Sequence, residues 1–353
     1  MRAAVANSGA LRVDDVADPV PGSGEVLARV KACGICGSDL HALVHGDRLA
    51  EQGAAAGIGS TFDPRCDYIM GHEFSAEVLE LGKDTEGSPV TVGDLVTSIP
   101  VILTPTGVET TAYSNTYNGG YAELILLSAP LCLKVPNGLD YRRAALTEPM
   151  AVGRHAVGKA NITPKDTAIV LGCGPVGLAT IADLRRRGVE TIVATDFSIR
   201  RRVAAQAMGA TEVVDPKDEP AIEAWRRITG GSAPVVIFEA IGVPGLLDLA
   251  IQAAPLQSRI VVVGVCMETD QINPFVAISK ELNIQFVLAY DLVEFSETLR
   301  SISEGEVDVS PLVSGRCGID GVPEAFDALG SPDTNVKILV EPEISGPIEA
   351  LTL

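Results

Sequence analysis

The chain has 353 residues, which is long enough for two domain cores. Of these residues 46% are hydrophobic and 21% are charged, a composition typical of folded proteins. Its 27 Lys and Arg residues are outnumbered by 46 Asp and Glu residues, so the net charge is −19. A surface this acidic repels nucleic-acid phosphates and anionic lipids, which argues against a nucleic acid or a membrane as partner.

The cellular compartment is indicated by what the sequence lacks. The first residues contain no basic region followed by an apolar run, so no signal peptide is expected. The longest uncharged run, residues 167–182, is too short to span a bilayer. Seven scattered cysteines, an odd number, favour free or metal-bound thiols over a disulfide framework. We therefore expect a cytoplasmic protein.

The N-terminal part of the chain is predicted to be rich in β-structure. Short alternating or β-branched runs, separated by Gly, Pro and Asp, predict antiparallel strands at 25–33, 74–82, 93–103 and 121–127. Residues 32–41, ACGICGSDLH, place two cysteines, a serine, an aspartate and a histidine within ten positions. Alone, this segment suits a metal site, a redox pair or a buried turn. Residues 49–63, which are mostly small, are expected to form a loop.

From about residue 160 apolar runs alternate with helical patterns. Strands are predicted at 167–172, 190–196, 212–215, 233–242, 259–265 and 283–289, with helices at 175–188, 199–210, 220–229 and 244–254. This alternation is typical of a doubly wound parallel sheet, the Rossmann type. The pattern is mixed again near the C-terminus, with helices expected near 294–304 and 322–329 and strands near 312–317 and 336–340.

A dinucleotide site is predicted at VLGCGPVGLATI, residues 170–181. Gly172, Gly174 and Gly177 have GxGxxG spacing between a strand and a helix, and Asp196 ends the next strand. Asp196 suits the adenosine ribose hydroxyls and repels a 2′-phosphate, which favours NAD over NADP, although arginines 200–202 nearby could receive a phosphate. The residues expected to bind the cofactor are Gly172, Gly174, Pro175, Val176, Gly177, Asp196, Arg201 and Val265.

A catalytic metal is indicated by three separate segments. They are CGICGSDLH with Cys36, GHE with His72 and Glu73, and EPM with Glu148. A Cys, a His and one or two Glu suit a catalytic zinc, which takes three protein ligands and leaves one position open.

At this point the sequence resembles the zinc-dependent medium-chain dehydrogenase/reductase family, which includes alcohol, sorbitol and threonine dehydrogenases. The resemblance rests on GICGSDLH, GHE, EPMAVG and VLGCGPVG, and it extends over essentially the whole chain. It implies an α/β fold in which residues 1–155 and 290–353 form a GroES-like, β-rich catalytic domain. Residues 156–289 would form the Rossmann NAD-binding domain inserted between them.

The resemblance also implies roles for individual residues. Cys36 and His72 would bind zinc, with Glu73 or Glu148 as third ligand and the two carboxylates able to exchange. Asp39 would accept a hydrogen bond from the His72 ring. Ser38 and His41 would form a proton relay, so the expected catalytic residues are Cys36, Ser38, His41, His72 and Glu148.

The sequence departs from the family between Gly93 and Tyr121. Many members have four closely spaced cysteines there that bind a structural zinc, and this segment has none. We therefore expect one zinc per chain. The resemblance further implies a homodimer or homotetramer.

Other residues have a structural interpretation as the first choice. Cys33 is expected to pack behind the site, Cys66 to lie in a loop with an accessory ligand role as the alternative, and His155 to be structural. For Lys337 we weigh a position near the pyrophosphate against an ordinary strand-edge lysine.

The predicted function is a zinc-dependent, NAD-linked oxidoreductase acting on a secondary alcohol, polyol or sugar hydroxyl. The alternatives are a zinc-free quinone or enone reductase of the same superfamily, and a nucleotide-binding protein without catalytic activity.

Overall fold

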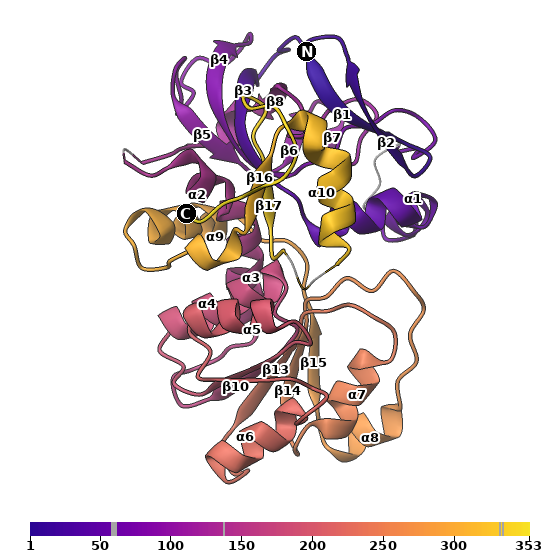
Figure 1. The fold of residues 1–353 in the computed structure, drawn as a ribbon, viewed down its shortest axis with the longest axis vertical. Coiled ribbons are helices and arrows are strands. Elements are labelled where there is room, and N and C mark those ends of the chain that lie inside the picture. The colour runs from indigo at the N-terminus through magenta and orange to yellow at the C-terminus, as the bar shows by residue number, and fades with distance from the viewer. Residues whose placement is uncertain (58–61, 137, 332, 334) are drawn as a thin grey trace.

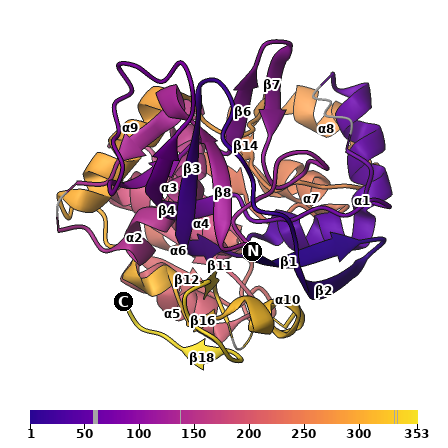
Figure 2. The same ribbon diagram turned by 90° about the horizontal axis from the view of Figure 1, so that it is seen from above.

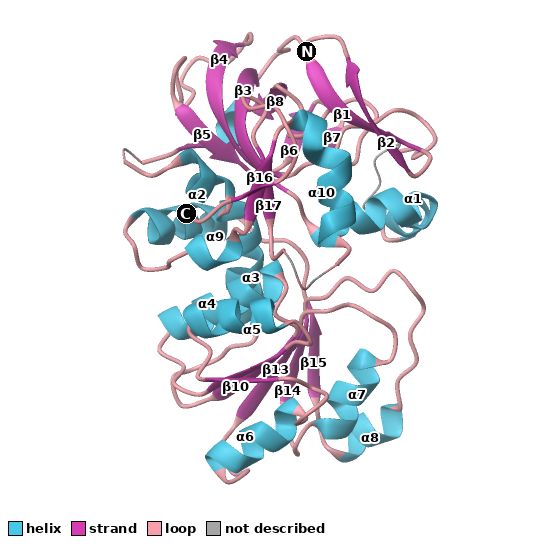
Figure 3. Cartoon of the chain, in the orientation of Figure 1, coloured by secondary structure: helices cyan, strands magenta, loops and turns pink. Residues whose placement is uncertain are grey.

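The chain is built around two β-sheets of different kinds, which lie one above the other in Figure 1. The computed structural model describes residues 1–57, 62–136, 138–331, 333 and 335–353. The upper sheet contains strands from both ends of the chain, and the lower sheet contains strands from its middle (Figure 3).

The upper sheet is mostly antiparallel and has the order β18-β16-β17-β3-β4-β5-β9, with β8 paired to β3. Its strands are β3 (Glu25–Gly34), β4 (Glu73–Leu81), β5 (Leu95–Ser98), β8 (Leu124–Ser128), β9 (Cys132–Lys134), β16 (Gly315–Cys317), β17 (Ile338–Val340) and β18 (Glu349–Ala350). Two short ribbons lie beside it, β1 (Arg2–Asn7) with β2 (Ala10–Asp15) and β6 (Val101–Thr104) with β7 (Gly107–Thr110). The pairing of β17 with β3 attaches the C-terminal segment to the N-terminal one.

The lower sheet is entirely parallel, and its order is β12-β11-β10-β13-β14-β15. The strands are β10 (Thr167–Leu171), β11 (Ile192–Thr195), β12 (Glu212–Val214), β13 (Val235–Glu239), β14 (Arg259–Val262) and β15 (Asn283–Phe286). The strand order reverses between β10 and β13, which is where doubly wound sheets bind ligands. The predicted doubly wound sheet is confirmed.

Helices cover both faces of the lower sheet because side chains alternate along each strand. On β10, Ala168 and Val170 pack into the core with α3, α4 and α5, and Ile169 and Leu171 pack into the core with α6 and α7. The helices that follow the strands are α4 (Pro175–Arg186), α5 (Ile199–Ala207), α6 (Ala221–Thr229), α7 (Leu246–Ala253) and α8 (Pro274–Ser279). The others are α2 (Tyr141–Ala145), α3 (Thr147–Lys159), α9 (Leu292–Ser303) and α10 (Val322–Leu329).

The segment after the Cys36 turn differs from its prediction. Residues 49–63 were expected to be a loop, but α1 spans Gly37–Ala55 and bends at His45, where the backbone leaves the helical region. The Leu, Ala, Glu and Gln residues of LAEQGAA are good helix formers, so the loop prediction was wrong for residues 49–55. Residues 58–61 lie outside the described residues. Figure 2 shows α1 on the side of the molecule that carries α7 and α8, opposite α9.

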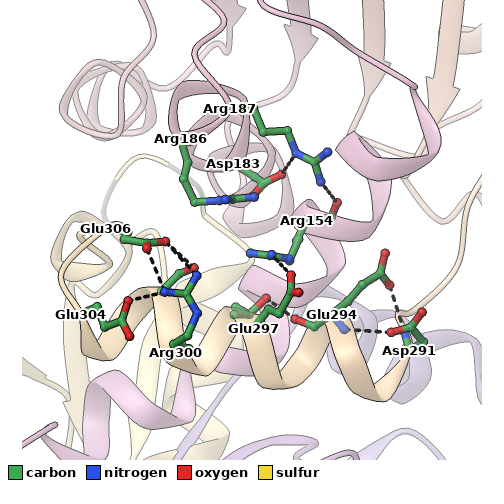
Figure 4. A network of polar contacts seen from close by, with 12 residues as sticks. Arg154, Asp183, Arg186, Arg187, Asp291, Glu294, Glu297, Arg300, Glu304 and Glu306 are labelled. Carbon is green, nitrogen blue, oxygen red and sulfur yellow. Dashed lines mark hydrogen bonds and ion pairs between the residues drawn. The ribbon is translucent and has the colours of Figure 1, made fainter.

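A polar network fastens α3 to α4 and α9 (Figure 4). Asp183 on α4 is buried between Arg186 and Arg187, which approach it to 2.8 and 2.7 Å. Arg154 on α3 pairs with Glu297 on α9. The network links helices packed on the lower sheet to the segment that returns the chain to the upper sheet.

The structure also bears on two further predictions, the structural role of His155 and the absence of a membrane-spanning segment. His155 on α3 lies with Nδ1 2.7 Å from Glu294 Oε2 on α9, in agreement with a structural histidine. In the part of the chain that is described, no helix has the length and apolar character needed to cross a bilayer.

Candidate metal and cofactor site

Pairing of β3 with β4 brings the predicted metal ligands together. In the antiparallel register Gly34 lies opposite Glu73, so Cys36, just past the end of β3, lies beside His72 and Glu73 at the start of β4. A ligand atom of each of Cys36, His72 and Glu73 lies within 4.8 Å of the other two. Among the described residues, this is the one group of three or more Cys, His, Asp or Glu side chains whose ligand atoms lie close enough together to hold a metal ion.

Asp39, on the first turn of α1, is fully buried and accepts hydrogen bonds from several directions. Tyr121 Oη donates to Oδ2 at 2.6 Å, the backbone N–H of Cys36 to Oδ2 at 3.0 Å, and Tyr113 Oη to Oδ1 at 2.8 Å. Nδ1 of His72 lies 3.3 Å from Oδ1. Because Nδ1 faces Asp39, Nε2 is the ring nitrogen that remains for a metal.

The pKa values of this pair follow from burial and from each other. Burial acts to raise the pKa of Asp39, but the charge of His72 and the hydrogen bonds from His72, Tyr121 and Cys36 outweigh it and leave that pKa below its usual value. Burial acts to lower the pKa of His72, and Asp39 raises it well above the usual value. Asp39 is therefore a permanent carboxylate that orients the His72 ring.

Glu73 is paired with Lys337, a contact that the sequence did not predict. Lys337 and Glu73 are both fully buried, and Nζ of Lys337 contacts Oε2 of Glu73 and donates to the carbonyl oxygen of Ile35 at 3.1 Å. The strand-edge position predicted for Lys337 was wrong, because the side chain is fully buried and paired with Glu73, and the position near the pyrophosphate stays a prediction. The pairing of β17 with β3 brings this lysine to the metal ligands from 264 residues further along the chain.

Glu148 lies near the ligands but outside the group of three. It is 8% exposed at the start of α3, and its Oε1 accepts a hydrogen bond of 2.9 Å from Tyr290 Oη. Burial raises the pKa of Glu148 to about 7, with the charges of His72 and Glu73 acting in opposite directions. Tyr290 was missed in the sequence, because nothing in its local pattern indicates a contact across 142 residues.

The two predicted relay residues lie on α1. Ser38 is partly buried, with Oγ 3.0 Å from Tyr113 Oη, and His41 is exposed one turn further along. The ring centroids of His41 and His45 are 6.4 Å apart. Partial burial and the charge of His45 both lower the pKa of His41.

The donor set fits a zinc ion. Oε1 of Glu73 is buried and has no hydrogen-bond partner among the described residues, although Oε2 is paired. A buried carboxylate oxygen without a partner costs free energy, and a cation beside Cys36 and His72 would remove that cost. One sulfur, one nitrogen and one oxygen donor are the ligand types of catalytic zinc.

The cysteines outside this group have other surroundings. All seven are free, so Cys33 and Cys36 form no disulfide. Cys33 is buried where side chains on Gly71 or Gly120 would lie 2.8 Å from its sulfur, and burial raises the pKa of its thiol well above the usual value. Cys66 is exposed and outside the metal-ligand group.

The glycine motif forms a close turn at the carboxyl end of β10. A Cβ on Gly177 would lie 2.0 Å from the carbonyl oxygen of Gly172, whereas a Cβ on Gly174 would meet nothing within 4 Å. Gly177 thus lets α4 pack against the turn, and Gly174 leaves open space before the helix N-terminus. Pro175 and Val176 are the first two residues of α4. Pro175 has no backbone N–H, so Val176 is the first residue of this helix that can offer one to a phosphate.

The predicted ribose-binding residue lies beside this turn. Asp196 accepts hydrogen bonds from the backbone N–H groups of Cys173 at 2.9 Å and Ser198 at 2.8 Å. Nη1 of Arg201 lies 3.9 Å from Oδ2 of Asp196, and its Nε has no hydrogen-bond partner among the described residues. Arg202 instead donates to the carbonyl oxygens of Asp196 and Phe197 and pairs with Asp215, which is a structural role.

The neighbouring turns are held by a buried glutamate that the sequence did not reveal. Oε1 of Glu239, at the end of β13, accepts from the N–H groups of Ile241 at 2.7 Å and Gly242 at 2.8 Å. A Cβ on Gly242 would lie 2.6 Å from the nitrogen of Val265, so the turns after β13 and β14 are in close contact. Val265, predicted to bind the cofactor, is 53% exposed at this edge.

The far half of α1 reaches the turn after β14. Nη1 of Arg48 and Nε2 of Gln52 donate to the carbonyl oxygen of Met267 at 3.3 and 3.0 Å. The helix that begins at the metal ligands therefore also contacts the edge of the sheet that carries the glycine turn.

Comparison with known proteins identifies the two parts of the chain. Residues 22–137 match the alcohol dehydrogenase GroES-like domain, and residues 175–304 match the zinc-binding dehydrogenase domain. The chain is 32% identical to (R,R)-butanediol dehydrogenase of Bacillus subtilis, over 94% of this chain and 96% of that protein. It is 28% identical to sorbitol dehydrogenase of the same organism, over 97% of each. A zinc-binding dehydrogenase of Sinorhizobium meliloti, solved bound to NADP, is similar at a TM-score of 0.81 and 27% identity, over 97% of this chain and 99% of that one.

Proposed function

The chain belongs to the zinc-dependent medium-chain dehydrogenase family and is an alcohol or polyol oxidoreductase, and we propose that it transfers a hydride from a secondary alcohol, polyol or sugar hydroxyl to NAD. The observation that carries this proposal is the meeting of Cys36, His72 and Glu73, with one oxygen of Glu73 buried and unpaired among the described residues. The presence of these three ligands argues against a zinc-free reductase.

We assign the metal to Cys36, His72 and Glu73, with Glu148 as the carboxylate that would exchange with Glu73. When bound, zinc supplies a Lewis acid that lowers the pKa of an alcohol hydroxyl, and the nicotinamide supplies the hydride acceptor. Asp39 keeps His72 in the tautomer that offers Nε2. Lys337 neutralises one oxygen of Glu73 and so fixes which oxygen is left for the metal.

Proton removal is assigned to Ser38 and His41. Ser38 lies two residues beyond Cys36 and accepts the proton of the substrate hydroxyl as its own proton moves on. His41 is exposed one turn further along the helix, so it can pass a proton to water. Its lowered pKa keeps the ring neutral, and so able to accept a proton, at neutral pH.

The first experiment measures zinc per chain together with NAD reduction on a panel of secondary alcohols and polyols. One zinc per chain is expected, because residues 93–121 contain no cysteine. Cys36→Ser should lose both zinc and activity, whereas Cys66→Ser, the matched change at an exposed cysteine outside the ligand group, should keep both. Wild type without zinc, or activity that survives in Cys36→Ser, would contradict the metal assignment.

The preference for NAD is supported by Asp196. Its carboxylate lies beside the glycine turn and repels a 2′-phosphate, while Arg201 at 3.9 Å would attract one. We expect kcat/KM to be higher with NAD than with NADP. Asp196→Asn removes the charge and keeps one of the two oxygens, which accept separately from the N–H groups of Cys173 and Ser198. It should narrow the ratio of kcat/KM for NAD to that for NADP roughly tenfold, equivalent to about 1.4 kcal/mol. A wild-type preference for NADP would contradict this assignment.

The substrate class is narrowed by the named relatives. Butanediol and sorbitol are the substrates in the names of the two relatives, and both carry adjacent hydroxyl groups. We therefore propose a substrate with a second hydroxyl next to the one oxidised. Activity on a simple secondary alcohol that equals the activity on its vicinal diol would contradict this narrower assignment.

We further propose a homodimer or homotetramer that uses the β15 edge of the lower sheet. β15 pairs only with β14 among the described strands, which leaves one edge available to a second copy. Large apolar side chains on and beside this edge are exposed, namely Phe275, Ile278, Phe286 and Leu288. Such a patch on one edge marks an interaction surface.

A further inference from the structure

We propose that Tyr113 is a positioning residue that holds Ser38 in place for proton transfer, an inference that rests on the relay assigned above. Tyr113 lies outside the metal ligands and the helix that carries the relay. It belongs to the segment 93–121, which contains no cysteine.

The contact is direct and involves both groups that follow Cys36. Oη of Tyr113 lies 3.0 Å from Oγ of Ser38 and 2.8 Å from Oδ1 of Asp39. The ring of Tyr113 lies 5.7 Å from the ring of His72, centroid to centroid. One hydroxyl thus connects the relay serine to the carboxylate that orients a metal ligand.

Counting protons shows the direction of each hydrogen bond. A phenol has one proton to donate, and Asp39, as a carboxylate, only accepts. The proton of Tyr113 therefore goes to Asp39, and the Ser38 hydroxyl donates to Tyr113 Oη when no substrate is bound. This arrangement fixes the χ1 rotamer of Ser38 and turns a lone pair of its oxygen away from Tyr113.

In the reaction Tyr113 keeps its proton throughout. Ser38 takes the proton of the substrate hydroxyl and releases its own to the next acceptor toward His41, so each group ends with the proton count it began with. Burial and the charge of Asp39 hold the pKa of Tyr113 well above its usual value, which excludes it as the base. Its contribution is the position of Ser38.

A comparison with Tyr121 distinguishes the positioning of Ser38 from the support of Asp39. Oη of Tyr121 donates to Oδ2 of Asp39 at 2.6 Å and lies 3.3 Å from the carbonyl oxygen of Gly34, and no contact with Ser38 is seen among the described residues. Tyr121→Phe therefore removes support of Asp39 alone, and Tyr113→Phe removes contacts with both Asp39 and Ser38.

The experiment is a double-variant cycle on the zinc-loaded enzyme with Tyr113→Phe, Ser38→Ala and the combination. Tyr113→Phe should lower kcat roughly tenfold. In the Ser38→Ala background the same change should lower kcat by less than twofold, because the group it positions is gone. Tyr141→Phe, which loses a hydroxyl contact to Glu341 away from the site, is the matched control and should keep kcat within twofold.

A second readout is independent of turnover. The visible spectrum of the Co²⁺-substituted protein should shift no more for Tyr113→Phe than for Tyr121→Phe, because each variant removes one hydrogen bond to Asp39. Only Tyr113→Phe also removes the contact with Ser38, so its loss of kcat should exceed that of Tyr121→Phe. The substitution of Phe for Tyr keeps the ring, and thermal unfolding measures whether the fold is retained.

Three results would overturn the inference: an unchanged kcat in Tyr113→Phe, an equal further loss in the Ser38→Ala background, or a loss of kcat in Tyr121→Phe as large as that in Tyr113→Phe. The proposed function fails on a different measurement. Wild type without zinc or without alcohol oxidation would contradict it before any tyrosine variant is made.

Discussion

Gly34 shows that a missing side chain can be a requirement of the metal site. A Cβ at this position would lie 2.1 Å from Oε2 of Glu73, a distance that real side chains do not reach. Because Glu73 is also held by Lys337, it has no room to retreat. The glycine therefore makes space for the buried ligand.

We expect Gly34→Ala to lose zinc and to be destabilised by about 1–3 kcal/mol, the usual cost of overpacking. Zinc content and thermal unfolding measure the two effects. Gly37→Ala is the matched control, since a Cβ on Gly37 meets nothing within 4 Å and its backbone is helical. Equal zinc loss in both variants would contradict the steric explanation.

His41 sets the expected pH dependence. Partial burial and the charge of His45 lower its pKa below the ordinary value of about 6.5. A relay that ends on neutral His41 is fully active above that pKa and loses activity as the pH falls through it. The acid limb of log kcat against pH should therefore lie below about pH 6.5.

Two variants test this assignment. His45→Ala removes a charge that lowers the pKa of His41, so the acid limb should move to higher pH. His41→Gln should remove the limb and slow alcohol oxidation, with the zinc content unchanged. An acid limb that persists in His41→Gln would assign it to another group.

At the scale of elements, α1 joins the metal ligands to the sheet that carries the glycine turn. Its first turn contains Ser38 and Asp39, and its far half holds the carbonyl oxygen of Met267 through Arg48 and Gln52. These two contacts order the turn after β14, next to Val265 and Gly242.

We expect Arg48→Ala with Gln52→Ala to weaken NAD binding roughly fivefold, the equivalent of about 1 kcal/mol for the lost hydrogen bonds. The turn after β14 would then have to be ordered when the cofactor binds. The dissociation constant, measured by titration, should rise while zinc content stays the same. Arg65→Ala, which removes an exposed arginine paired with Asp63, should leave NAD affinity unchanged.

At the scale of the whole molecule, the lower sheet has one edge that the described chain leaves open. Phe286 on β15, Leu288 just after it, and Phe275 and Ile278 on α8 are exposed. Burial of such apolar area between two copies would stabilise an assembly by about 25 cal/mol per Å² of surface removed from water, before the cost of association.

Light scattering after size-exclusion chromatography tests the assembly. Wild type should elute as a dimer or tetramer, and Phe286→Glu with Leu288→Glu should shift it toward smaller species. Val20→Glu, a change at a valine that is 81% exposed and far along the chain, should not. Wild type that elutes as a monomer at all concentrations would rule out the proposed interface.

The sequence by itself determined the elements whose causes are local. The glycine turn at 172–177, the six strands between 167 and 286 and the helices α4 to α7 follow from periodicity and from positions that only glycine can occupy, whereas α8 was not predicted. Two parts of the site also have local causes. Cys36 and Asp39 lie three residues apart in the sequence, and His72 and Glu73 are adjacent. Residues 49–55 were assigned wrongly, since small residues suit both a loop and a helix. The single strand predicted at 93–103 is two strands, β5 and β6, in different sheets.

The tertiary structure decided which distant side chains complete the site. Tyr113 and Tyr121 reach Asp39 across 74 and 82 residues, Tyr290 reaches Glu148 across 142, and Lys337 reaches Glu73 across 264. A tyrosine or lysine in an apolar run has the same local pattern whether it faces a solvent edge or a buried carboxylate. Strand pairing, above all that of β17 with β3, settles the choice, because a buried charge requires a partner wherever the fold can supply one.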